Sequence, residues 1–173
     1  MHIALQVLIA LVPSLAIFAT SYFMMKSFIE NETRRRQQEI KFGNKELITP
    51  VRLQAYERVV LFLERISPNS LVMRVFKNGM SGKLLQAELI KSIRGEYEHN
   101  MSQQVYMSNQ AWELVKTAKE ETIKLINIAG SNVPDTASGL EFANAVIDIA
   151  GQLKKLPTQV AIEALKLELS KEF

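Results

Sequence analysis

The chain has 173 residues, with 21 lysine and arginine residues against 18 aspartate and glutamate residues, and it contains no cysteine. The lack of cysteine excludes disulfides, thiolate metal sites and cysteine nucleophiles. Most of the net charge of +3 comes from Lys26 to Gly43, so the remainder of the chain offers no electrostatic support for nucleic-acid binding.

The first long segment is uncharged. Residues Ile3 to Met25 contain no charged side chain, and Lys26 and the cluster Arg34–Arg36 follow them. At about 1.5 Å per residue, a helix of this length crosses a hydrocarbon core of roughly 30 Å. The apolar run is too long, and its start too uncharged, for a cleaved signal peptide. We therefore predict a retained transmembrane anchor over residues 1–25, with the N-terminus outside and the C-terminal domain in the cytoplasm.

Small residues recur at four-residue spacing within this segment, which favours close approach of another helix. They form two pairs, Ala10 with Ser14 and Ala16 with Thr20. We therefore expect these four positions to pack against a second membrane helix.

Three consecutive arginines follow the anchor at Arg34, Arg35 and Arg36. Near an anionic membrane each such charge contributes about 1 kcal/mol of binding. These side chains are therefore candidates for lipid-headgroup binding. The alternative is that they only set the orientation of the anchor and stay solvated.

Beyond the anchor the patterns are helical. Residues 26–43 are polar and predict a juxtamembrane helical stalk that ends at Gly43. Residues 44–173 are enough for one domain with its own core. Apolar periodicity and capping residues predict about five helices there, over Pro50–Ile66, Gly82–Met101, Asn109–Ala129, Pro134–Leu156 and Thr158–Lys171. The predicted fold is all-α: a transmembrane helix continuing into a polar stalk, then a compact bundle of about five helices.

Not every part of this domain is predicted to be helical. Leu71 to Phe76 alternates weakly between apolar and other residues, and it has no second strand to pair with. We predict an extended connector there. Ser81 and Ser108 are predicted to cap the two helices that follow them.

The helix predicted after Pro50 is apolar over more than one face, beyond what one core-facing stripe needs. This excess makes it a candidate partner interface. The side chains proposed for that surface are Tyr56, Val60, Phe62 and Leu63. The alternative is a central helix surrounded by its own bundle.

A metal centre is the one catalytic arrangement with some support. Glu96 and His99 stand three residues apart, the spacing of half a carboxylate-bridged di-iron site. The only other histidine is His2, so a symmetric dimer would have to complete the site. We predict no metal, no cofactor and no enzymatic activity, and interpret His99 as bonded to a neighbouring carboxylate or carbonyl.

Several segments together resemble an uncharacterised bacterial family of small single-pass membrane proteins, a domain of unknown function. They are Pro50–Arg58, Leu61–Asn69, Glu96–Asn100, Gln110–Leu114 and Lys124–Asn127. The resemblance spans nearly the whole chain and implies the architecture, but it supplies no activity, cofactor or catalytic residue. Together with the predicted anchor, it implies a location in a bacterial inner membrane.

We therefore predict a membrane-tethered helical interaction module, an accessory or scaffold subunit of an inner-membrane complex. Its expected partners are the membrane and other membrane-protein subunits, or further copies of itself, with neither nucleic acid nor a small-molecule substrate. One alternative is an adaptor that binds anionic lipid through Arg34–Arg36. The other is a metal-dependent enzyme using Glu96 and His99.

Overall fold

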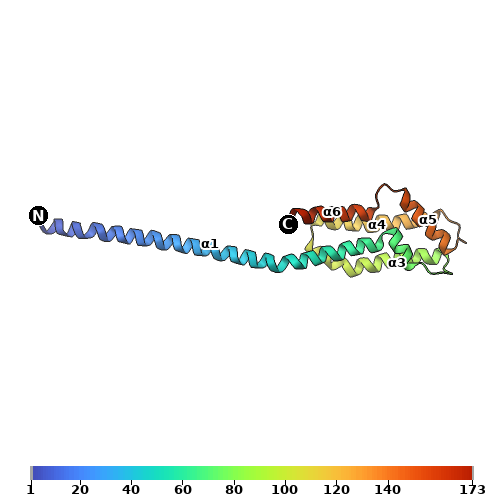
Figure 1. Ribbon diagram of the computed structural model, residues 1–173, viewed down its shortest axis with the longest axis horizontal. Coiled ribbons are helices and arrows are strands. Elements are labelled where there is room, and N and C mark those ends of the chain that lie inside the picture. Colours follow the sequence, from blue (N-terminus) through green and yellow to red (C-terminus); the bar gives the residue numbers. More distant parts are fainter. Residues whose placement is uncertain (1, 173) are drawn as a thin grey trace. The chain divides into compact units, whose positions relative to one another are not determined.

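The computed structural model describes the backbone of residues 2–172 and the side chains of residues 13, 15–36 and 49–171. The chain divides into two compact units, Met1–Pro50 and Val51–Phe173. In chain order the elements are α1 (His2–Ile66), α2 (Pro68–Val75), α3 (Gly82–Asn100), the 3-10 helix η1 (Met101–Tyr106), α4 (Asn109–Ser131), α5 (Gly139–Gln152) and α6 (Pro157–Glu172) (Figure 1). The described residues contain no strand beyond an isolated bridge, which confirms the predicted all-α fold.

The transmembrane anchor predicted for residues 1–25 is wrong. Within the described part of the chain, no helix combines the length and the apolar character that crossing a membrane requires. The predicted location, single-pass in a bacterial inner membrane with the N-terminus outside, depended on this anchor and is wrong with it.

Two helix boundaries predicted inside α1 are absent. The sequence predicted a helix end at Gly43 and a new helix start at Pro50, but α1 continues through both positions. Glycine inside a helix costs about 0.5–1 kcal/mol relative to alanine, which does not by itself end a helix. Proline removes one backbone donor, and the neighbouring turns can keep their helical geometry around it.

The core of the second unit takes apolar side chains from all of its α-helices. Leu85, Leu89 and Ile93, which lie four residues apart along one side of α3, are fully buried. Phe62 of α1 and Phe142 of α5 are among the largest buried side chains. Burying a side chain of this kind contributes roughly 1.5–3 kcal/mol, so these positions supply much of the driving force for folding.

Three aromatic rings connect α1, α3 and α4 inside this core. The ring of Tyr97 stacks on Trp112 at 5.7 Å between centroids and lies 6.0 Å from the ring of Phe62. Lys119 Nζ lies 4.2 Å from the centroid of Tyr97. Because offset aromatic pairs and a cation over a ring each add to simple burial, this row fixes the relative positions of the three helices.

The N-termini of α3 and α5 are held together by two backbone hydrogen bonds. Gly82 N donates to Ala137 O at 2.9 Å, and Gly139 N donates to Met80 O at 2.8 Å. Both contacts bring backbone close to backbone. A Cβ on Gly139 would lie 2.7 Å from Met80 O, so only glycine fits there without a shift.

Two predicted elements of the second unit differ from the structure. Leu71 to Phe76 was predicted as an extended connector, but Leu71–Val75 lies in α2, where Leu71 and Val72 are buried. Pro68 suits the first position of a helix, and one helical turn buries both of these side chains on one side.

The caps predicted at Ser81 and Ser108 are confirmed, since each side-chain oxygen accepts a backbone N–H three residues on.

Helix α5 begins at Gly139 rather than at the predicted Pro134. Ser138 and Glu141 form a capping box, in which Glu141 N donates to Ser138 Oγ at 3.2 Å and Ser138 N donates to Glu141 Oε2 at 2.7 Å. These two bonds satisfy donors that the start of a helix leaves free. The box therefore determines where the helix begins, and Pro134 belongs to the preceding turn, with its carbonyl accepting from Ala137 N.

Candidate binding groove

An open groove of about 410 Å³ lies between α4, α6 and the end of α5. We call it the α4–α6 groove; these two helices lie side by side in the second unit (Figure 1). Its apolar lining comprises Leu114, Ala118, Leu125, Ile128, Ile149, Leu153, Pro157, Val160 and Ala161. The groove is a concave, mainly apolar surface, the kind that receives a ligand or a partner side chain.

The floor of the groove is formed by alanines of α4 and α6. Ala118 and Ala161 are each 1% exposed, and their side chains end at Cβ, which leaves space above them. Around this floor Ile128, Leu153 and Val160 stay 45%, 43% and 44% exposed. Short residues below and large apolar residues at the sides therefore shape the groove.

Three charged residues line the groove, Glu121, Lys124 and Lys155, and each is held in an ion pair. Lys124 Nζ lies 3.7 Å from Glu121 Oε1, and Lys155 Nζ donates to Glu163 Oε2 at 2.6 Å. All four side chains are about half exposed or more. Exposed pairs of this kind contribute little to folding, so they are available to rearrange around a bound group.

A second polar cluster joins α1, α4 and α6 around the carboxylate of Glu168. Ser108 N and Ser108 Oγ donate to its two oxygens at 3.0 and 2.6 Å, and Tyr56 Oη donates to it as well. Ser108 Oγ also accepts from Ala111 N, as the N-cap of α4. A carboxylate beside the first turn of a helix faces the positive end of its dipole, which favours the charged form.

The pKa of Glu168 is below the ordinary glutamate value. Burial acts to raise this pKa, but the hydrogen bonds from Ser108 and Tyr56 and the nearby charge of Arg52 outweigh that effect. The carboxylate is therefore ionised at neutral pH and works as an acceptor for three donors. These hydrogen bonds link α6 to α1 and to the start of α4.

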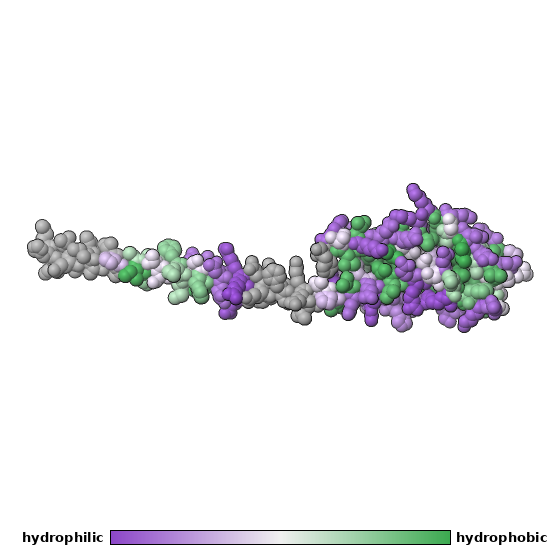
Figure 2. Space-filling model, in the orientation of Figure 1, coloured by the Kyte–Doolittle hydropathy of each residue, from purple (hydrophilic) through white to green (hydrophobic). Residues whose placement is uncertain are grey.

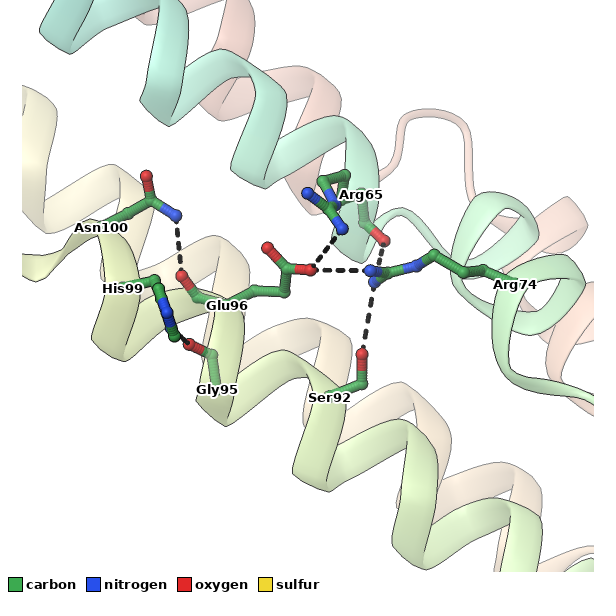
Figure 3. A network of polar contacts seen from close by, with 7 residues as sticks. All are labelled: Arg65, Arg74, Ser92, Gly95, Glu96, His99 and Asn100. Carbon is green, nitrogen blue, oxygen red and sulfur yellow. Dashed lines mark hydrogen bonds and ion pairs between the residues drawn. The ribbon is translucent and has the colours of Figure 1, made fainter.

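Glu96, the first residue of the proposed metal pair, lies in a third cluster (Figure 3). Its Oε1 atom is 3.0 Å from an Arg65 nitrogen and 2.6 Å from Arg74 Nη1. His99 Nδ1 lies 3.2 Å from Gly95 O, as predicted for a histidine bonded to a carbonyl. Two arginines occupy the carboxylate that a metal would need, and the described residues contain no group of three potential ligands.

The residues predicted as a partner interface lie mainly inside the second unit. Tyr56, Phe62 and Leu63 are at most 2% exposed, and Val60 is partly buried against the same core. The chain itself therefore covers these side chains. This arrangement corresponds to the alternative left open by the sequence, a central helix surrounded by its own bundle.

The remaining predicted site residues lie in the first unit. The side chains of Ala10 and Ser14 are outside the described residues, whereas Thr20 Oγ1 bonds to the carbonyl of Ala16 at 2.6 Å within α1. The lipid-headgroup cluster Arg34–Arg36 is exposed, and Arg36 Nε lies 3.2 Å from Glu32 Oε1. Lipid binding by these arginines stays a prediction.

Sequence reasoning missed the α4–α6 groove. Leu153 and Val160 line this groove and are among its exposed residues. The signal in the sequence was that each of the two helices carries alanines as well as larger apolar residues, such as Ala118 and Leu125 on α4. That pattern becomes informative only once α4 and α6 are known to be neighbours.

The described residues thus define an all-helical protein whose second unit carries an open apolar groove. The chain belongs to a family of unknown function (DUF7935), which matches residues 2–172. This match confirms the predicted membership in a domain family of unknown function, while the bacterial origin of the family stays a prediction. No curated protein and no solved structure matches the chain.

Proposed function

We propose that the protein is a non-catalytic interaction module, an accessory or scaffold subunit that binds one helix of another protein in the α4–α6 groove. The observation that supports the proposal is the exposure of Ile128, Leu153 and Val160 around a buried floor. Apolar side chains gathered in a groove are typical of a surface that a partner covers. The carboxylates of Glu96 and Glu168 are engaged in ties between helices, which favours a role without catalysis.

The shape and charge of the groove indicate what kind of partner it accepts. A groove between two helices receives the ridge of side chains of a third helix. Such a helix inserts apolar anchors spaced three or four residues apart. Since both a glutamate and lysines line the groove, we expect charged residues of both signs beside these anchors.

The test compares the full-length protein with the variant Val160→Asp. Affinity purification from cells that produce the protein naturally would identify the chains that co-purify with it. A candidate partner is then purified, and its Kd for both forms is measured by calorimetry. We expect Val160→Asp to weaken binding at least about tenfold, because a charge in the groove removes one apolar anchor.

The matched control is Leu84→Asp on α3. Leu84 is 49% exposed, close to the 44% of Val160, and it lies outside the groove. This variant should bind the partner as tightly as the unchanged protein does. A purified partner that binds Val160→Asp with an unchanged Kd would contradict the proposal.

A further inference from the structure

One side of α1 in the first unit carries a regular row of large apolar side chains, which we call the seam. Its members are 57–72% exposed and recur at alternating intervals of three and four residues: Leu15, Phe18, Tyr22, Met25 and Ile29. In Figure 2 the described part of the first unit begins with a mainly green, hydrophobic stretch, followed by a hydrophilic segment in purple. The spacing is the heptad pattern by which two helices interlock their side chains.

Two charged residues continue the seam. Glu32 and Arg36 follow Ile29 at the same intervals of three and four residues. Within the helix, Arg36 Nε lies 3.2 Å from Glu32 Oε1. The seam is therefore apolar over most of its described length and carries an acid and a base at one end, so the relative direction of two paired seams matters.

We propose that two copies of the chain pair through this seam in the parallel direction. In a parallel pair, Glu32 of one copy lies one layer from Arg36 of the other, and the two ion pairs between copies offset the repulsion between like residues that face each other. An antiparallel pair that overlaps the seam puts Glu32 opposite Leu15. That carboxylate would lose water without gaining a basic partner from the second copy, so charge complementarity selects the parallel arrangement.

The seam is distinct from the other candidate surfaces. Given about 3.6 residues per turn, Ala16 and Thr20, the small residues predicted to pack helices, lie on the opposite side of α1. The seam also shares no residue with the α4–α6 groove. Pairing of two copies therefore goes beyond the proposed function, and either can fail without the other.

The lack of native cysteine allows a direct test by disulfide formation in the purified full-length protein. In a parallel pair, position 25 of one copy meets position 25 of the other, within the Cα separation of about 4.4–6.8 Å that a disulfide needs. Under mild oxidation Met25→Cys should run on a non-reducing gel at twice the 19.6 kDa chain mass. The control is Met24→Cys, an adjacent exposed methionine on the far side of the helix, which should stay largely monomeric.

The outcomes separate pairing from indiscriminate association. Equal cross-linking of Met24→Cys and Met25→Cys would overturn the proposal, because apolar aggregation has no preferred side. Light scattering that gave a monomer mass for the unchanged protein up to its solubility limit would overturn it too.

A second pair of variants tests the charges at the end of the seam. Arg36→Glu should dissociate the pair, since four carboxylates then face each other, and the double variant E32R/R36E should restore it. A double variant that stays dissociated while the unchanged protein pairs would contradict the parallel charge arrangement. Because all of these positions lie in the first unit, the fold of the second unit serves as an internal check.

Discussion

Two apolar stretches of α1 have opposite surroundings. In the second unit Tyr56, Phe62 and Leu63 are at most 2% exposed, whereas the seam from Leu15 to Ile29 is 57–72% exposed. The difference comes from the cover: five further α-helices of the described chain complete a core around the first group. An apolar side of a helix therefore indicates that other residues must cover it, but it does not identify those residues. For the seam, we propose that a second copy of the chain supplies them.

The largest expected effect tests this contrast with one residue type in both stretches. Phe62→Ala should lower the free energy of unfolding by about 3–5 kcal/mol, because it opens a cavity beside Tyr97. Phe23→Ala, at a side chain that is 67% exposed and outside the seam, should leave urea unfolding of the second unit unchanged. If Phe62→Ala does not fold, Phe62→Leu should show a smaller loss in the same direction. Similar effects at Phe62 and Phe23 would break the comparison.

The next effect tests how tightly the covered region is closed. Gly139→Ala puts a Cβ 2.7 Å from Met80 O and should cost about 1–3 kcal/mol, since the backbone at the α3 and α5 N-termini must shift. Gly151→Ala in the same helix meets nothing within 4 Å, and it should stabilise the protein by about 0.4–1 kcal/mol. Thermal unfolding of both variants measures the difference. Equal shifts in Tm would show that the two helix termini are not in close contact.

Glu168 tests whether hydrogen bonds between helices stabilise the fold as the apolar core does. Glu168→Gln should cost about 1–2 kcal/mol at neutral pH, less than buried hydrogen bonds to charged groups provide, because this side chain is only partly buried. Since the pKa of Glu168 is lowered on folding, its contribution is fully present above the ordinary glutamate pKa. It is lost as the pH falls through the lower pKa of the folded state.

The pH dependence of the free energy of unfolding tests the direction of this effect. The difference in free energy of unfolding between the unchanged protein and Glu168→Gln should be largest at neutral pH and should shrink in acid. Urea unfolding at stepped pH values measures it. A difference that stays constant into acid would show that the loss comes from packing and not from the ionised carboxylate.

Much of the second unit could be predicted from local chemistry. Ser81 and Ser108 cap their helices as expected, and the four-residue spacing of Leu85, Leu89 and Ile93 marks the buried side of α3. The start of α5 was predicted wrongly because Pro134 is a common first residue of helices. The competing signal, serine followed three residues later by glutamate at Ser138 and Glu141, was present in the sequence.

The groove and the polar ties could not be predicted in the same way. Glu168 and Tyr56 are 112 residues apart, so no local pattern brings them together. The prediction for residues 1–25 failed for a related reason. Hydropathy reports how much apolar surface a segment has, and the same property is shared by a membrane span, a core helix and a helix that pairs with a copy of itself.

The smallest effect that still separates covered from uncovered residues concerns two glutamates with basic partners. Glu96 is 18% exposed and faces two arginines from α1 and α2, so Glu96→Gln should cost about 1 kcal/mol, given that Arg65 is half exposed and partly screened. Glu113 is 67% exposed and pairs with Lys116 on the same helix, so Glu113→Gln should cause no measurable change in urea unfolding. If the two variants lose the same stability, partial burial would not be what gives the Glu96 cluster its strength. If only Glu96→Gln loses stability, burial by neighbouring helices decides how much an ion pair contributes to folding. The same dependence on burial then holds for the ion pairs and for the apolar residues of this protein.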